Sequence, residues 1–323
     1  LTGLSIATSS LYKTILYSAF LAIMVVIHSY VGFKLCNRFL NKTISLIIAT
    51  VIVVFLLIPA IFAFMYTHQP KVIPVVPHNA PSEAFEDVII TSKGDRNISG
   101  WYVTAPNSVG HILFLHEPGS SREQWSKFAV KLFFSNYSSL LIDFPGAGRS
   151  DGTKSTLGVY EKDDVIAAIN WLKERDANKS VFIVSKSIGA NAVASAMNDR
   201  DGFKADAVAM IDGYAHGVDY FADGIAQKLG DFMATIYTPS IKLGFSAAAG
   251  VDLNDTSIVN SLAGSTVSWP VLLIQAENRK DDEFYKTELI KKTVGANLKD
   301  RYVVADKKGG ICDKKYSICV EII

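Results

Sequence analysis

The chain has 323 residues, enough for two domains or for one large α/β domain with an appendage. Its net charge of +1 arises from 32 basic and 31 acidic residues in no long block, which argues against a nucleic-acid partner. The three cysteines, Cys36, Cys312 and Cys319, show neither zinc-ligand spacing nor a disulfide framework. No metal site is therefore expected, and no cofactor is expected either.

The N-terminal region is predicted to be integral to a membrane. Residues 15–33 and 44–66 carry no formal charge over 19 and 23 residues. About 20 apolar residues of helix suffice to cross a bilayer, so both segments can span it. The basic residues Lys34, Arg38 and Lys42 crowd the connection between them. The positive-inside rule then favours a cytoplasmic connection and a large domain on the extracytoplasmic side.

Residues 71–84 carry three prolines and are predicted to form an extended linker. Beyond it, two β-rich runs at 87–92 and 98–104 flank a turn and indicate a hairpin. Further strands are predicted at 111–115, 138–144, 181–184, 207–211, 271–275 and 301–305, and helices at 124–134, 160–175, after 188 and at 283–294.

Strands and helices that alternate in this way predict an α/β fold with a mostly parallel sheet and helices on both faces. Residues 214–269 break the alternation and are rich in Ala, Gly and aromatic residues, which favours a small helical cap. The expected organisation is a membrane region over residues 1–70, a linker over 71–84 and an α/β domain over 85–323.

The stretch from Ser185 to Gly189 reads Ser-Lys-Ser-Ile-Gly, with a buried strand before it and small, helix-compatible residues after it. This pattern is typical of a nucleophile elbow, in which a serine occupies a tight turn from strand to helix. The turn would place the Ser187 hydroxyl near a helix N-terminus, where amide groups stabilise an oxyanion. An ordinary strand-to-helix turn is the alternative interpretation.

Taken together, the motifs from residue 85 to 313 resemble the α/β-hydrolase superfamily, in particular its membrane-anchored, serine-aminopeptidase-like and esterase-like branches. The opening hairpin, an oxyanion loop at 116–122, a Gly-rich segment at 143–152, the stretch 157–165, the elbow and the strand from Trp269 occur in the family's order. The resemblance implies a sheet of about eight strands and a Ser–acid–His triad in that chain order.

The resemblance makes Ser187 the nucleophile and places the acid a few residues beyond the strand at 271–275. Asp281 and Asp282 are the candidate acids, with Glu277 as a further carboxylate, whereas the commonest family register falls on Arg279. A solvated acidic cluster at a helix N-terminus explains the same residues equally well.

The family's histidine follows the last strand, where this chain has Gly310 and Ile311. The six histidines are His28, His68, His78, His111, His116 and His216, so none follows the candidate acids. His216 is the remaining candidate base, with a polar residue at the start of the cap as the other interpretation. His116 is expected to be a structural loop residue.

The oxyanion loop also departs from the family pattern. The amides of Ile188 and Glu117 are the candidate oxyanion donors, but the next loop residue is Pro118, which has no N–H. The loss of one such donor typically costs about a hundred- to a thousand-fold in rate.

Two functions are therefore predicted as alternatives. The first is a membrane-anchored serine hydrolase acting on an ester, thioester or peptide-like acyl bond, with a small acyl-type substrate or a lipid as partner. The second is a catalytically impaired relative that serves as a binding or scaffold module. The sequence favours descent from active hydrolases and, without a histidine base, weak reactivity.

Overall fold

The computed structural model describes residues 30, 33–34, 42–78, 80–199, 202–262, 269–276, 290, 294 and 298–304. The chain divides into two compact units. Unit 1 comprises Leu1–Thr67 and Phe221–Leu253, and unit 2 comprises His68–Tyr220 and Asn254–Ile323.

Unit 1 is helical. Its main elements are α2 (Lys42–Thr67) and α7 (Asp231–Ala249), which pack against each other, and the greater part of α6 (Gly217–Leu229). The ring of Phe221 contacts Tyr66 of α2 and Phe245 of α7, with centroid separations of 5.2 Å and 5.6 Å.

The predicted span 44–66 lies within α2, whereas the span 15–33 lies almost wholly outside the described residues. Among the helices that the structure describes, none meets the combined requirement of length and apolar character for crossing a bilayer. Membrane insertion therefore stays a prediction from the sequence.

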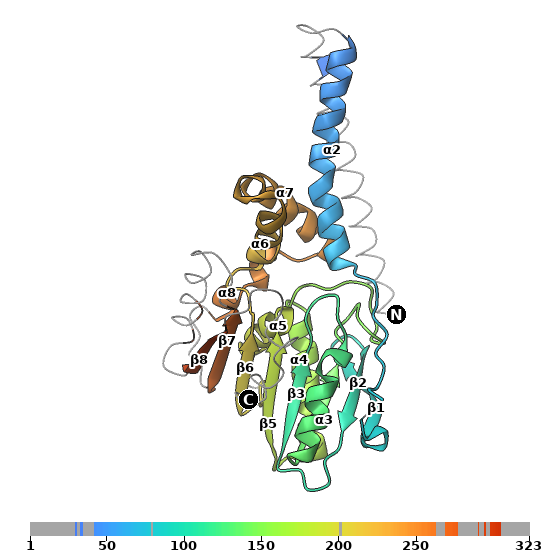
Figure 1. Cartoon of the computed structure of the whole chain (residues 1–323), viewed down its shortest axis with the longest axis vertical. Helices are drawn as coiled ribbons and strands as arrows, with labels where there is room; N and C mark the ends of the chain where they lie inside the picture. Colours follow the sequence, from blue (N-terminus) through green and yellow to red (C-terminus); the bar gives the residue numbers. More distant parts are fainter. Residues whose placement is uncertain are drawn as a thin grey trace. The chain divides into compact units, whose positions relative to one another are not determined.

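Unit 2 is built on one eight-stranded sheet with the order β1-β2-β4-β3-β5-β6-β7-β8 (Figure 1). Strand β2 runs antiparallel to β1 and β4, and the other pairings are parallel. The strands are β1 (Phe85–Ser92), β2 (Arg96–Val103), β3 (Gly110–Leu115), β4 (Tyr137–Ile142), β5 (Ser180–Lys186), β6 (Ala207–Ile211), β7 (Val271–Ala276) and β8 (Leu298–Val304). The mostly parallel sheet of about eight strands predicted from the sequence is confirmed.

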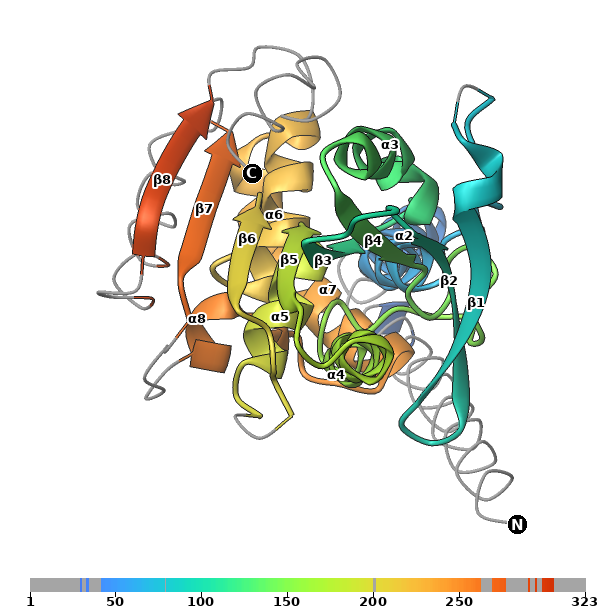
Figure 2. The ribbon, with the colours of Figure 1, turned by 90° about the horizontal axis from the view of Figure 1, so that it is seen from below.

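Helices cover both faces of this sheet (Figure 2). Helix α3 (Ser126–Phe134) lies on one face, and α4 (Glu161–Arg175) and α5 (Ile188–Ala196) lie on the other. The buried rings of Phe114, Trp125 and Phe128 join the sheet to the α3 layer. Shorter helices occur at η1 (Ser82–Ala84), η2 (Arg122–Trp125), η3 (Leu253–Thr256) and α8 (Ile258–Leu262).

The described residues of the predicted linker form no regular element before η1, and they are bonded to the rest of unit 2. The amide of Val75 donates to a carboxylate oxygen of Glu123 at 2.9 Å, and Lys71 donates to the carbonyl of Ser150 at 2.5 Å. The linker therefore lies against η2 and the Gly-rich segment 143–152.

Candidate active site

Ser187 occupies a strained turn between β5 and α5. Its backbone angles are φ 56° and ψ −116°, a conformation that a residue with a side chain adopts only when its surroundings enforce it. The Ser187 amide donates to the carbonyl of Ile211 at 2.8 Å, which fastens the turn to the end of the neighbouring strand β6. The Ser187 side chain is largely buried, and it stands at the N-terminus of α5 as the sequence predicts.

Two positions after Ser187, the close approach of the oxyanion loop to the turn favours glycine. A Cβ placed on Gly189 would lie 3.0 Å from the carbonyl oxygen of Leu115 and 3.3 Å from that of His116. The small-x-Ser-x-Gly pattern thus corresponds to a real close approach of two backbones.

The two predicted oxyanion donors differ in this arrangement. Ile188 is the first residue of α5, where helix amides have no partner within the helix. The amide of Glu117 donates to Oε1 of Gln124 at 3.2 Å, so this donor is engaged. Since Pro118 has no N–H, Ile188 is the better placed donor of this loop and turn.

A charge pair joins the elbow to the oxyanion loop. Lys186, the residue before Ser187, is 3% exposed, and its Nζ lies 3.0 Å from Oε1 of Glu117. The same oxygen accepts a hydrogen bond from Nε2 of Gln124 at 2.8 Å. The unexpected carboxylate in the loop is therefore compensated by a neighbouring positive charge.

His116 is a structural residue. Its Nε2 accepts a hydrogen bond from the amide of Phe144 at 3.0 Å, so its Nδ1 carries the proton and donates to the carbonyl of Glu117 at 2.7 Å. Burial lowers the pKa of His116 below its ordinary value, despite the nearby carboxylate of Asp143. With both ring nitrogens bonded to backbone groups, His116 holds the loop and cannot accept the Ser187 proton.

Of the predicted base and acids, only His216 lies among the described residues, and it is not hydrogen-bonded to Ser187. His216 stands just before α6, where its amide donates to Asp219 at 3.0 Å and its Nδ1 lies 3.5 Å from the hydroxyl of Ser257. Asp281, Asp282 and Glu277 lie outside the described residues, as do Gly310 and Ile311.

Asp212 is a further residue beside Ser187 that was not predicted from the sequence. It follows β6 directly, is buried, and has a positive φ of 49°. Because the Ser187 amide binds the carbonyl of Ile211, the strained serine and the strained aspartate are neighbours at the carboxyl edge of two parallel strands. An Asp immediately after a buried strand was the available signal, since ligands and catalytic groups gather at this edge.

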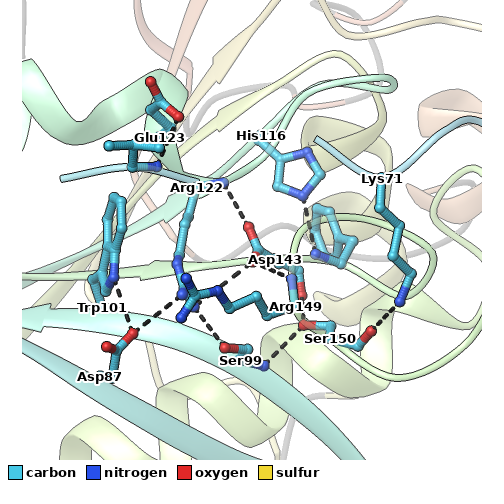
Figure 3. A network of polar contacts seen from close by, with 12 residues as sticks. Lys71, Asp87, Ser99, Trp101, His116, Arg122, Glu123, Asp143, Arg149 and Ser150 are labelled. Carbon is cyan, nitrogen blue, oxygen red and sulfur yellow. Dashed lines mark hydrogen bonds and ion pairs between the residues drawn. The ribbon is translucent and has the colours of Figure 1, made fainter. Parts of the chain in front are cut away.

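A buried polar network fixes the loops around the site (Figure 3). Asp143, at the end of β4, accepts hydrogen bonds from the amides of Arg122 and Arg149 at 2.7 Å and 3.0 Å. The fully buried guanidinium of Arg122 lies 3.7 Å from Asp143 and donates to Ser99 at 2.7 Å. Arg122 of the loop at 116–122 and Asp143 of the Gly-rich segment therefore have structural roles.

A cavity of about 630 Å³ opens elsewhere, between β1 and α4. Its lining includes Ile89, Lys93, Asp163 and Trp171, and it includes neither Ser187 nor Glu117. It is separate from the chemistry described above.

Known structures resemble this chain in fold. The Pyrococcus furiosus esterase Pf2001 is similar with a TM-score of 0.58 at 19% identity, over 78% of this chain and 94% of that protein. An alpha-beta hydrolase from Vibrio vulnificus is similar with a TM-score of 0.55 at 17% identity, over 75% of this chain and 82% of that one. The chain has the α/β-hydrolase fold.

Sequence comparisons agree with this α/β-hydrolase assignment. Residues 106–255 match the family model described as Hydrolase_4, serine aminopeptidase S33. The uncharacterized protein YfhR of Escherichia coli strain K12 is 26% identical over 179 residues, which are 52% of this chain. The chain spans 60% of the length of that relative, and the YfhR of strain O157:H7 gives 27% identity over the same shares.

Proposed function

We propose that this α/β-hydrolase is a serine hydrolase that cleaves an ester, thioester or peptide-like acyl bond through Ser187. The observation that carries the proposal is the backbone of Ser187, held at φ 56° between β5 and the N-terminus of α5. Strain of this kind persists where the fold enforces it and is concentrated at functional sites. The matched family and the esterase fold relatives support the same reaction class.

The chemistry follows from the elbow. The Ser187 oxygen bonds to the acyl carbon, the carbonyl electrons move to its oxygen, and the amide of Ile188 stabilises that charge. The carbonyl then re-forms and the original acyl bond breaks, so the alcohol, thiol or amine leaves with the proton that the Ser187 hydroxyl gave up, and water hydrolyses the acyl-enzyme. The hydroxyl proton needs an acceptor, and no histidine of the described residues is hydrogen-bonded to Ser187.

The second proposal, a catalytically impaired binding or scaffold module, is favoured by this lack of a bonded histidine. Pro118 and the engaged amide of Glu117 add to it, because they leave the oxyanion site with fewer donors. We prefer the hydrolase to the binding module because binding alone does not require a strained backbone at Ser187. Acylation is expected to be slow.

The proposal includes location and partners. We propose that the two uncharged N-terminal segments anchor the chain in a membrane, with the α/β domain on the extracytoplasmic side. The substrate is then a small acyl compound or a lipid. Support comes from the sequence alone: 42 residues in two uncharged segments and three basic residues between them.

Hydrolysis of p-nitrophenyl esters of increasing chain length tests the reaction. The full chain should release p-nitrophenol slowly, and Ser187→Ala should fall to background. Ser195→Ala is the matched control, since Ser195 lies on α5 and bonds Ser261 rather than the elbow. Equal rates for the full chain and Ser187→Ala would favour the binding module. A loss of rate in His216→Gln would identify His216 as the base.

A further inference from the structure

Helix α7 has apolar side chains on both its inner and its outer face. Ala234, Tyr237, Ile241 and Phe245 form its buried face. The opposite face carries Phe232, Ile236, Pro239 and Leu243, at the i, i+4, i+7 and i+11 spacing of one helical stripe. Phe232 and Leu243 are 75% and 55% exposed. A helix with apolar stripes on two opposite faces has more apolar surface than one protein contact covers, which favours a second apolar environment on its outer face.

Two threonine hydroxyls of α7 are hydrogen-bonded within the helix itself. Thr235, on the exposed face, donates its hydroxyl to the carbonyl of Asp231 at 3.0 Å, and Thr238 donates to Ala234 at 2.6 Å. Groups in a hydrocarbon environment must find their partners internally, and bonds from Thr to the i−4 carbonyl meet that need. The formal charges of α7 are Asp231 in its first turn and Lys242, a long side chain able to reach the water interface.

Helix α2, in the same unit, also has exposed apolar side chains and threonine hydroxyls bonded within the helix. Leu46 and Ile47 near its start, and Ile61, Phe64 and Met65 near its end, are exposed. The hydroxyls of Thr50 and Thr67 donate to carbonyls four residues earlier at 2.9 Å and 3.0 Å.

In the two ends of α2 whose side chains are described, residues 42–50 and 61–67, the buried positions are small: Ser45, Ala49, Ala63 and Thr67. Small residues at helix contacts are characteristic of packing within membranes. The exposed residues Ile61, Phe62, Phe64 and Met65 occupy a wide arc of the helix rather than a single stripe. Lipid can surround a helix and contact such a wide arc, whereas a second protein would cover one face.

We propose that the exposed faces of α7 and α2 form a lipid-contacting surface, with α7 lying at the interface of a phospholipid bilayer. The inference rests on the proposed membrane association of the N-terminal segments and extends it to α7, which the sequence places in a cap of the hydrolase domain. The chain enters unit 1 at Phe221, ten residues after β6 ends, and leaves it at Leu253. Such a cap points to an acyl substrate taken from the bilayer.

Site-directed fluorescence in vesicles tests this surface. Cys36, Cys312 and Cys319 are first replaced by serine. The full chain then receives one cysteine, at Phe232, Thr235 or Leu243, labelled with a nitrobenzoxadiazole dye and reconstituted into phosphatidylcholine vesicles. Phe134→Cys is the matched control, because Phe134 is an equally exposed aromatic residue, 74% exposed, on α3 of unit 2. Tyr237→Cys, on the buried face of α7, is the internal control.

Labels at 232, 235 and 243 should be quenched by doxyl-lipid at least threefold more than the label at 134, and protected from aqueous iodide. Iodide quenching equal to that at 134 would overturn the proposal by showing a water-exposed face. Protection from both quenchers, as at 237, would also overturn it and would identify a protein partner or a second copy. Thr235→Cys serves if the larger residues prove necessary for folding. Anchoring and ester hydrolysis are measured separately, so failure of α7 to meet lipid is distinguishable from failure of either.

Discussion

Nζ of Lys186 lies 3.0 Å from the carboxylate of Glu117, which joins the residue before Ser187 to the loop at 116–122. The lysine of the elbow and the glutamate of the oxyanion loop therefore form one unit. The positive charge of Lys186 compensates the carboxylate of Glu117. Without it, the negative charge of Glu117 would oppose an oxyanion in the site beside the loop. Its position also couples the geometry of the loop to that of Ser187.

We predict a favourable coupling between these two side chains. In a double-mutant cycle of Lys186→Met and Glu117→Gln, the coupling free energy of unfolding should be about 1–3 kcal/mol. Denaturant unfolding of the full chain in detergent measures it. Lys93, whose Nζ lies 3.7 Å from Asp163 with its own side chain 76% exposed, provides the surface control pair, which should couple by less than about 1 kcal/mol. Equal coupling in the two cycles would mean that the buried pair has no special role.

Gly148→Ala should destabilise the domain far more than Gly94→Ala. Both glycines have positive φ, at 45° and 76°, so both substitutions carry a similar backbone penalty of about 1–2 kcal/mol. A Cβ at Gly148 would lie 1.9 Å from Oδ2 of Asp143, whereas one at Gly94 meets no atom within 4 Å. Thermal unfolding should show Gly148→Ala lower in Tm than Gly94→Ala. Similar Tm values would refute the close packing of the Asp143 network.

The stability of the domain should depend on pH through His111. Its burial, followed by the charge of Lys179, lowers the pKa of this histidine to about 4. The unfolded chain takes up a proton below its ordinary pKa of about 6.5, and the folded chain does not until about pH 4, so acidification across this window destabilises the fold. Over the whole of this pH window, the free energy of unfolding falls by about 3 kcal/mol through His111.

Asp164 acts in the opposite direction, because burial raises its pKa to about 6 and the folded chain gains a proton as pH falls from 6 towards 4. His111→Gln isolates the histidine. Its free energy of unfolding should fall less than that of the wild type between pH 7 and pH 4.5. A parallel fall in both proteins would show that His111 does not carry the effect.

Membrane anchoring is predicted to survive carbonate extraction, with the full chain remaining in the pellet because two uncharged segments hold it. External protease on spheroplasts should digest the α/β domain, in keeping with the basic residues between the segments. Release into the supernatant would contradict the anchor, and complete protection would reverse the orientation.

The sheet and the elbow were predictable from the sequence because they depend on local signals. Buried β-branched runs gave strands β5 and β6, with residues 207–211 predicted to the exact bounds. The small-x-Ser-x-Gly pattern predicted the turn that Gly189 makes possible. Helix α3 begins two residues later than predicted because η2 occupies its first turn.

Features that depend on tertiary contacts were not predictable. The pairing of Lys186 with Glu117 joins residues 69 positions apart, and no local pattern reports it. The strain at Asp212 arises from its place beside the elbow. The structural role of His116 became clear only when Phe144 and the carbonyl of Glu117 were seen to bind its two ring nitrogens.

The reactivity of Ser187 is the central claim, and labelling with a fluorophosphonate followed by mass spectrometry of the adduct measures it most directly. We predict slow but definite modification of the peptide containing Ser187, unchanged in Ser195→Ala and absent in Ser187→Ala. An adduct yield from the wild-type chain no greater than that from Ser187→Ala would contradict the account and leave the chain a hydrolase fold without hydrolase chemistry.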